Sequence, residues 1–308
     1  HGGAAPGPGQ GRAAMTEPFR PGRGQAIKKW RARLRARRRP RLKGVSFNRM
    51  LPNLLTLIGL CCGLTAIRFA FEGRFAAAAG AIVAAAVRAG LDGPLARLWK
   101  AASRFGAEFD SLSDFLCFGV APALVLYFWT LEAWRGFGYA PCLLFAVCAA
   151  LRLARCNSAL DAGPGPAYRQ HFFTGVPAPA GAMLGLFPLF AGLAAAEWGL
   201  VTAASLLAWP GVSALVLTGA GALMVSTLPT WSFKNFRLPE TLLLPLLIAV
   251  GLYAAFLVSE PWGAMALGGI AYVSMLPFSL RSYRRLKAEA EAIAEPVVAP
   301  PAAHAAQP

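Results

Sequence analysis

The chain has 308 residues, of which 56% are hydrophobic and only 14% charged, and its mean hydropathy is +0.51. Soluble globular proteins carry roughly 25% charged residues, so this composition excludes a wholly disordered chain and a coiled coil, and argues against a soluble enzyme. The formal net charge is nevertheless +16, from 30 Lys and Arg against 14 Asp and Glu. An apolar chain with a strong basic excess is typical of a multi-pass membrane protein with basic cytosolic segments.

The two ends of the chain are predicted to be basic and disordered. Residues 1–44 are rich in Gly, Pro, Ala and Arg, which leave little apolar surface to bury. Fourteen of the 30 basic residues lie within residues 1–50, most densely in the run Lys28–Lys43. We interpret this run as a topology signal that lies on anionic lipid, and we expect no nucleic-acid partner. Residues 281–308 are predicted to form a basic stretch followed, from Lys287, by a disordered tail.

Between these ends, residues 45–280 are predicted to form an all-α membrane domain. Crossing a bilayer takes roughly 20 mostly apolar residues. About eight segments satisfy this requirement: Leu51–Phe71, Phe75–Ala96, Phe115–Leu131, Tyr139–Arg155, Thr174–Ala196, Val201–Ser226, Thr241–Ser259 and Trp262–Leu280. The sixth contains Pro210 and Gly211, which could split it into an interfacial piece and a shorter span.

The distribution of basic residues predicts the orientation of these spans. If the N-terminus is cytosolic, 26 of the 30 Lys and Arg fall in segments on the cytosolic side and only three on the other side. This asymmetry follows the positive-inside rule. Both termini are therefore expected in the cytosol, with an even number of spans between them.

The acidic residues are unevenly placed. Four of the 14 fall in one window of 23 residues, where the second span ends and the third begins: Asp92, Glu108, Asp110 and Asp114. Ionised carboxylates at a membrane boundary are costly unless they are paired, solvated or bound to a cation. A divalent cation such as Mg²⁺, which prefers oxygen ligands and substrate phosphates, is one explanation. The alternative is that the carboxylates pair with the nearby basic side chains of Arg97, Lys100 and Arg104.

Helical spacing favours a shared site for two of these acids. An α-helix advances about 100° per residue, so Gly106, Asp110 and Asp114 fall on one stripe and Glu108 points elsewhere. On the preceding helix, the small residues Gly93 and Ala96 would let a nucleotide approach closely, although they could equally serve helix packing alone.

The residues from Ala89 to Asp114 resemble the signature of the CDP-alcohol phosphotransferases, D-x2-D-G-x2-A-R-x8-G-x3-D-x3-D. Seven of its eight fixed positions match at the required spacing. Four further segments resemble the phosphatidylserine synthase branch of that family: Leu51–Thr56, Phe109–Ala123, Leu151–Asn157 and Phe173–Pro179.

The resemblance implies a multi-pass enzyme of a bacterial inner membrane, with its site facing the cytosol. It would transfer a phosphatidyl group from CDP-diacylglycerol to L-serine and release CMP. The family holds two divalent ions, Mg²⁺ or Mn²⁺, against the pyrophosphate, and the enzyme could form a homodimer. Carried onto this sequence, the metal ligands would be Asp92, Asp110 and Asp114, with Asp114 also the general base. The CDP pocket would be lined by Asp92, Gly93, Ala96, Arg97 and Gly106. The serine carboxylate is expected at Arg152, Arg155 and Asn157, whose arginines could instead only anchor the helix end.

The signature is broken at its first aspartate, because this sequence has Ala89 at that position. An alanine cannot ligate a metal, so we expect weakened metal binding and impaired turnover. The adjacent Arg88 adds positive charge and restores no ligand. Two alternatives therefore stay open: a catalytically inactive family member that partners an active one, and the same chemistry on glycerol 3-phosphate or inositol phosphate. A transporter is disfavoured, because the two halves of the chain show no internal repeat.

Overall fold

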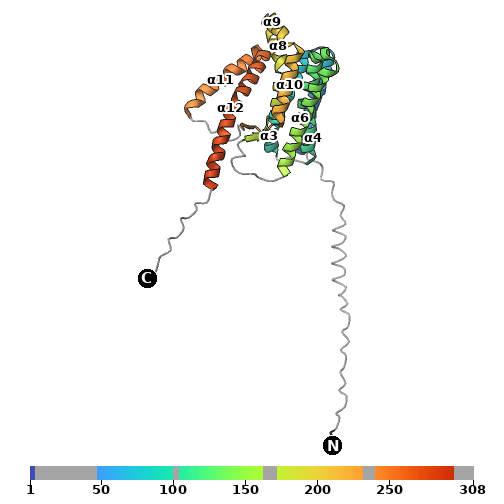
Figure 1. Cartoon of the computed structure of the whole chain (residues 1–308), viewed down its shortest axis with the longest axis vertical. Helices are drawn as coiled ribbons and strands as arrows, with labels where there is room; N and C mark the ends of the chain where they lie inside the picture. Colours follow the sequence, from blue (N-terminus) through green and yellow to red (C-terminus); the bar gives the residue numbers. More distant parts are fainter. Residues whose placement is uncertain (4–46, 100–103, 162–171, 232–239, 295–308) are drawn as a thin grey trace, which may run out of the picture. The chain divides into compact units, whose positions relative to one another are not determined.

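The computed structural model describes residues 1–3, 47–99, 104–161, 172–231 and 240–294 (Figure 1). Within these ranges, the side chains of 47–52, 92–99, 104, 159–161, 172–174, 229–231, 240–242 and 286–294 lie outside the described ones. The chain divides into two units, His1–Ser46 and Phe47–Pro308, and the described helices belong to the second.

The second unit is a helical bundle with one short antiparallel ribbon. Its elements in chain order are α2 (Phe47–Phe71), α3 (Phe75–Trp99), α4 (Arg104–Phe115), η1 (Leu116–Val120), α5 (Ala121–Trp129), η2 (Leu131–Trp134), α6 (Gly136–Asp161), β1 (Phe172–Thr174), α7 (Ala178–Gly185), α8 (Phe187–Glu197), α9 (Val201–Leu207), α10 (Pro210–Val225), β2 (Pro229–Trp231), α11 (Glu240–Ser259) and α12 (Pro261–Ala294). Strand β1 pairs with β2, so that Phe173 lies opposite Thr230. The all-α prediction therefore holds except for this ribbon.

Four helical segments in the described part of the chain are long and apolar enough to cross a membrane: Asn53–Phe71, Phe105–Trp129, Gly136–Ser158 and Pro261–Arg285. The count rises to six if two bent pairs are each one span, α7 with α8 (46°) and α9 with α10 (56°). The second bend confirms the predicted break at Pro210. The first was not expected; it falls at Leu186, just before Pro188, whose nitrogen has no hydrogen to donate.

Two predicted boundaries are wrong. The third span does not begin at Phe115, because α4, η1 and α5 form one apolar stretch from Phe105 to Trp129. Residues 104–114, which precede the predicted third span, are thus helical. The predicted disordered tail is also helical as far as Ala294, because α12 continues through a sequence rich in Ala, Glu, Lys and Leu, which are strong helix formers.

Small residues on α2 bring its neighbours close. Gly59 and Gly63, one turn apart, face the π-helical turn η1. A Cβ at Gly63 would lie 2.8 Å from the Sγ of Cys117, and that thiol donates a hydrogen bond to the carbonyl of Gly59 at 3.1 Å. Ser113 of α4 donates to the carbonyl of Thr56 at 3.3 Å. These contacts place the acid-bearing helix α4 directly along α2.

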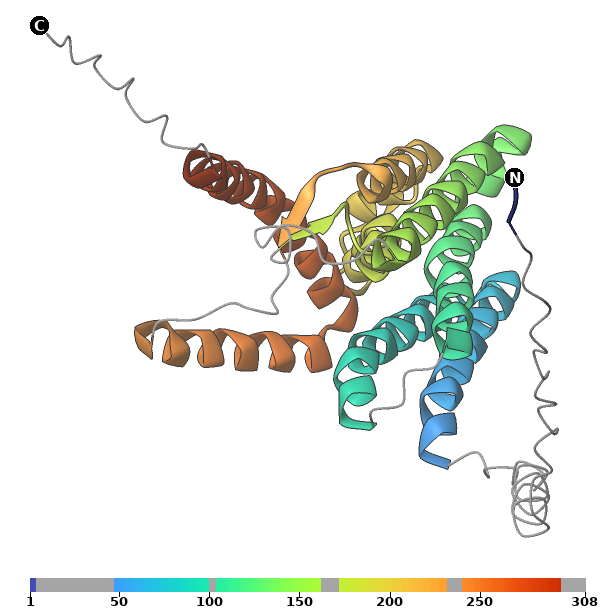
Figure 2. The same cartoon turned by 90° about the horizontal axis from the view of Figure 1, so that it is seen from below.

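The last two helices differ from the rest of the bundle. Helix α11 packs against α12, and Figure 2 shows it extending away from the other helices. Its side chains from Leu243 to Tyr253 are all exposed and mostly apolar. The apolar core instead lies among α5, α6, α8 and α10, around the buried side chains of Leu126, Phe145, Phe190 and Leu217.

Candidate functional site

The two acids predicted to share a stripe are close together in the structure. Asp110 and Asp114 lie one turn apart on α4, on the side that faces α2 and α3. Their side chains are 41% and 18% exposed. Glu108 is exposed and lies on another face of the same helix, as predicted. The prediction that Asp110 and Asp114 share one face of α4 and that Glu108 lies on another is confirmed.

A buried arginine of α3 lies between these two acids. The Nη1 atom of Arg88 is 3.5 Å from Oδ1 of Asp110, and its Nη2 atom is 3.3 Å from Oδ1 of Asp114. The Arg88 side chain is only 8% exposed. One guanidinium therefore pairs with both carboxylates at once, in a part of the protein where an unpaired charge would be costly.

Helix α2 makes room for this guanidinium. Gly59 lies against it: a Cβ at that position would come within 2.6 Å of the Cζ atom of Arg88. One turn earlier, the hydroxyl of Thr56 donates to Oδ1 of Asp110 at 3.4 Å. We call Thr56, Arg88, Asp110 and Asp114 the ion-pair cluster; three helices build it, and a glycine permits their close approach.

Helix α6 adds two polar groups beside the cluster. Arg152 is half-buried and interacts electrostatically with Asp114. The amide of Asn157 donates to the hydroxyl of Ser111 at 3.0 Å, which ties α6 to α4. The predicted serine-binding residues therefore lie on a helix that packs beside the acids.

The remaining predicted serine-binding residue, Arg155, forms hydrogen bonds to backbone carbonyls. Its guanidinium donates to three successive carbonyls at the end of α10: Val225 at 2.8 Å, Ser226 at 3.1 Å and Met224 at 3.3 Å. A helix C-terminus leaves such carbonyls without intrahelical partners, and a cation there also matches the helix dipole. Arg155 thus holds the end of α10 against α6, a role that the sequence analysis did not foresee.

The other predicted site residues lie at the end of α3 and the start of α4. Asp92, Gly93, Ala96 and Arg97 belong to the last turns of α3, where the backbone is described and the side chains are not. Ala89, at the lost aspartate position, is half-buried and packs against the apolar cluster that contains Cys117 and Phe118. Gly106 lies on α4, one turn before Asp110.

The described side chains do not fit a two-cation site. Among them, no group of three or more His, Cys, Asp or Glu gathers closely enough to hold a metal ion. Ala89 offers no oxygen, and the space between Asp110 and Asp114 contains the guanidinium of Arg88. Mg²⁺ binds its oxygen ligands at about 2.0–2.1 Å, and a guanidinium that already pairs with both acids competes with an ion at that distance.

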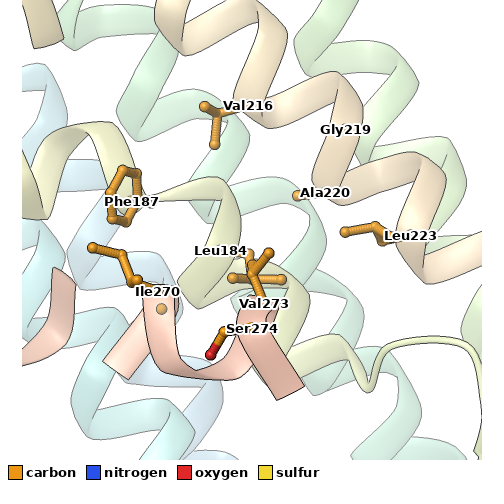
Figure 3. A pocket seen from close by; sticks show the side chains of 10 residues that line it. Leu184, Phe187, Val216, Gly219, Ala220, Leu223, Ile270, Val273 and Ser274 are labelled. Atoms are coloured by element: carbon orange, nitrogen blue, oxygen red, sulfur yellow. The ribbon is translucent and has the colours of Figure 1, made fainter. Parts of the chain in front are cut away.

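A separate apolar cavity of about 470 Å³ lies among α7, α8, α10 and α12 (Figure 3). Its walls include Leu184, Phe187, Leu223 and Val273, and Ser274 is the one residue with a polar side chain among those lining it. Helix α7 contributes to the wall of this cavity through Leu184, and its Ala182 packs in the apolar cluster that contains Cys117 and Phe118.

Comparison with known proteins defines the class. Residues 49–226 match the family model described as CDP-alcohol phosphatidyltransferase, and residues 241–277 match CDP-alcohol phosphatidyltransferase 2. The chain belongs to the CDP-alcohol phosphatidyltransferase family, which confirms the resemblance seen in its signature.

Several relatives share a more specific name. The chain is 42% identical over 246 residues to CDP-diacylglycerol–serine O-phosphatidyltransferase of Mycobacterium tuberculosis (strain H37Rv), across 79% of this chain and 82% of that protein. It is 38% identical over 256 residues to the protein of the same name from Mycobacterium leprae, across 82% of each chain. A shorter match, 38% over 135 residues, joins it to the Helicobacter pylori protein of that name, across 44% of this chain and 55% of the relative.

Proposed function

We propose that this chain transfers the phosphatidyl group of CDP-diacylglycerol to L-serine, giving phosphatidylserine and CMP. The observation that carries this proposal is its identity of 38–42% to serine phosphatidyltransferases across about four fifths of both chains. The α4 half of the family signature, Gly106, Asp110 and Asp114, is complete and forms one helical stripe.

The reaction needs a base and a fixed geometry. The serine hydroxyl attacks the phosphorus of the phosphatidyl group, the P–O bond to CMP breaks, and the hydroxyl proton goes to a carboxylate. We assign that carboxylate to Asp114, the less exposed of the two acids. Placing the hydroxyl and the lipid phosphate in line lowers the barrier further.

Arg152 is the residue to which we assign the serine carboxylate. It interacts electrostatically with Asp114, so a serine held by its carboxylate at Arg152 would have its hydroxyl near the base. Asn157 and Arg155, the other two predicted contacts, support the site through Ser111 and the end of α10. The CDP pocket is assigned to the end of α3, at Gly93, Ala96 and Arg97.

The use of Mg²⁺ or Mn²⁺ stays a prediction. Its oxygen ligands would be Asp92, Asp110 and Asp114, and a bound ion would neutralise charge on the pyrophosphate. Because Ala89 and Arg88 do not fit a two-ion site, the steps proposed above use only side chains of the protein.

The membrane arrangement proposed is eight helices with both termini in the cytosol of a bacterial cell. Four long spans, two bent pairs and two shorter apolar helices, Phe75–Leu91 and Leu243–Ser259, overlap the eight predicted segments and support this arrangement. The positive-inside asymmetry supports a cytosolic site at an inner membrane. A homodimer stays a prediction, to be tested by the mass of the protein–detergent particle.

The apolar cavity suits an acyl chain of the lipid substrate. A lining with a single polar side chain, between helices that can cross the bilayer, favours a hydrocarbon ligand over a polar one. The headgroup would then enter the ion-pair cluster, while acyl chains stay in apolar surroundings.

The test is serine-dependent release of CMP by the purified full-length protein in detergent micelles containing CDP-diacylglycerol. We expect labelled CMP only when L-serine is added. Release with glycerol 3-phosphate and not with serine would replace the proposed acceptor. If no acceptor produced CMP, the chain would be an inactive family member, the alternative that Ala89 motivates.

A further inference from the structure

The signature is altered at its first position, Ala89, and the residue just before it, Arg88, affects the local charge in the same direction. Ala89 removes a negative charge where the family pattern has an aspartate, and Arg88 brings a positive charge into the bundle beside it. Ala89 packs its methyl group among apolar residues, while Arg88 turns toward α2 and α4. The local formal charge is therefore two units more positive than with an aspartate at 89 and an uncharged residue at 88.

The position of Arg88 conflicts with a metal ion at the same acids. Its two terminal nitrogens lie 3.5 Å and 3.3 Å from the Oδ1 atoms of Asp110 and Asp114. A divalent ion shared by those carboxylates would have to lie about 2 Å from their oxygens, in the space that the guanidinium takes. Arginine keeps its charge in proteins, so it cannot yield this space by losing a proton.

The surroundings hold the guanidinium in place. The side chain is 8% exposed and lies against Gly59, whose missing side chain leaves the necessary room. Thr56 donates to Asp110 on the same side of the pair. Arg88 is thus enclosed by α2 and bridges two acids of α4, unlike a surface arginine that samples many positions.

We propose that Arg88 is a built-in cation: its guanidinium neutralises Asp110 and Asp114 and keeps a divalent metal ion out of this pair. The proposal deepens the proposed function, because it concerns the charge balance of the same site. It nevertheless concerns metal binding, which can be measured without turnover.

The experiment measures Mn²⁺ binding to the full-length protein in detergent, by the loss of the free-ion electron paramagnetic resonance signal. The variants are Arg88→Leu, Ala89→Asp and Arg88→Leu/Ala89→Asp. We expect weak binding by the original protein and by Ala89→Asp, and binding at least about 10-fold tighter by the double variant, on the scale at which groups around a metal site change affinity. Arg68→Leu is the matched control, because it removes an arginine from another carboxylate pair, at Glu72, and should leave Mn²⁺ binding unchanged.

A second kind of variant, Gly59→Ala, tests the proposal even if Arg88→Leu does not fold. Arg88→Leu leaves two carboxylates without their guanidinium and could destabilise the bundle. Gly59→Ala keeps every charge, and the atoms nearest its new methyl group are the Cδ, Nε and Cζ of Arg88, so it should displace the guanidinium without removing either partner of the pairs. We expect it to tighten Mn²⁺ binding as well.

Two results would overturn the proposal: Mn²⁺ affinity unchanged in folded Gly59→Ala and in the double variant, or an original protein that binds Mn²⁺ as tightly as the double variant. Serine-dependent CMP release is measured on the same samples. Absence of that activity in every variant, with the expected change in Mn²⁺ binding, would reject the proposed function and leave the role of Arg88 intact.

Discussion

The ion-pair cluster, on α2, α3 and α4, and the apolar cavity, among α7, α8, α10 and α12, are built on different principles. In the cluster, a few directional contacts between Thr56, Arg88, Asp110 and Asp114 pair a buried guanidinium with two carboxylates. The cavity is open on one side and is lined by ten residues, among which Ser274 alone has a polar side chain.

The difference predicts which substitutions each region tolerates. A charge that loses its partner inside a membrane protein is costly, so the cluster should respond to the change of a single atom. Apolar walls surrounded by lipid can exchange one hydrocarbon contact for another. The cavity should therefore respond to volume and hardly at all to the identity of individual side chains.

The largest effect is expected at Asp114. Asp114→Asn replaces one oxygen by an NH₂ group and removes the proposed base, so serine-dependent CMP release should fall by about 100-fold or more. Glu108→Gln is the control: the same change on the exposed face of α4 should leave the rate within about twofold. Equal rates for the two variants would show that the buried acid has no special role.

A smaller but clear effect is expected from Arg155→Ala. Three carbonyls of residues 224–226 would lose a charged donor, which should destabilise the folded protein by about 3 kcal/mol. Thermal unfolding in one detergent measures this, with the exposed Arg284→Ala as control. Unchanged stability together with a raised KM for serine would instead favour the predicted role of Arg155 in binding the substrate carboxylate.

Filling the cavity should have a moderate effect that depends on the lipid. A Cβ at Gly219 meets no atom within 4 Å, so Gly219→Leu can occupy the cavity without moving the backbone. Each buried methylene contributes about 0.8 kcal/mol, and the loss of two would lower activity on long-chain CDP-diacylglycerol by about 10-fold. Gly251→Leu on α11 is the control, since its Cβ also meets open space.

The comparison of substrates makes this prediction specific. A short-chain analogue should be converted at the same rate by Gly219→Leu and by the control variant. Equal loss on both substrates would mean that the cavity does not hold the acyl chain.

Much of the helical arrangement can be predicted from hydropathy, helical spacing and the positions of proline. Hydropathy located the helical segments, and the advance of about 100° per residue placed Asp110 and Asp114 on one face and Glu108 on another. The break at Pro210 follows from the missing amide hydrogen of proline. The third span was predicted to begin only at Phe115, whereas the apolar helical stretch begins at Phe105, because the acids of α4 lower the mean hydropathy there without interrupting the helix.

The contacts that build the site join residues far apart in the sequence, so helical periodicity and hydropathy do not predict them. Arg155 meets carbonyls about 70 residues away, a contact that depends on how α6 packs against the end of α10. Arg88 meets acids 22 and 26 residues later, on the next helix of the described chain. One signal was nevertheless present: an arginine inside an apolar span normally faces the interior and has a partner.

The smallest effect is expected at an exposed ion pair of the same chemical kind as Arg88 with its acids. At the turn between α2 and α3, Nε of Arg68 lies 2.8 Å from Glu72, and Nη1 of Arg74 lies 3.4 Å from it. The hydrogen bond from Arg68 lowers the pKa of Glu72 below its usual value. This stabilisation is therefore present above about pH 4.3, the ordinary glutamate pKa, and is lost as the pH falls through the lowered pKa of the folded protein.

Water screens these groups, so Glu72→Gln should leave the melting temperature almost unchanged at neutral pH. Thermal unfolding of both proteins from about pH 3 to about pH 7 measures the difference, which should shrink further toward the acid end as Glu72 takes up its proton. Arg88→Leu, which breaks pairs of similar length in a buried place, should lower the melting temperature far more. If the two variants lost equal stability, burial would not explain why the ion-pair cluster and the exposed turn differ.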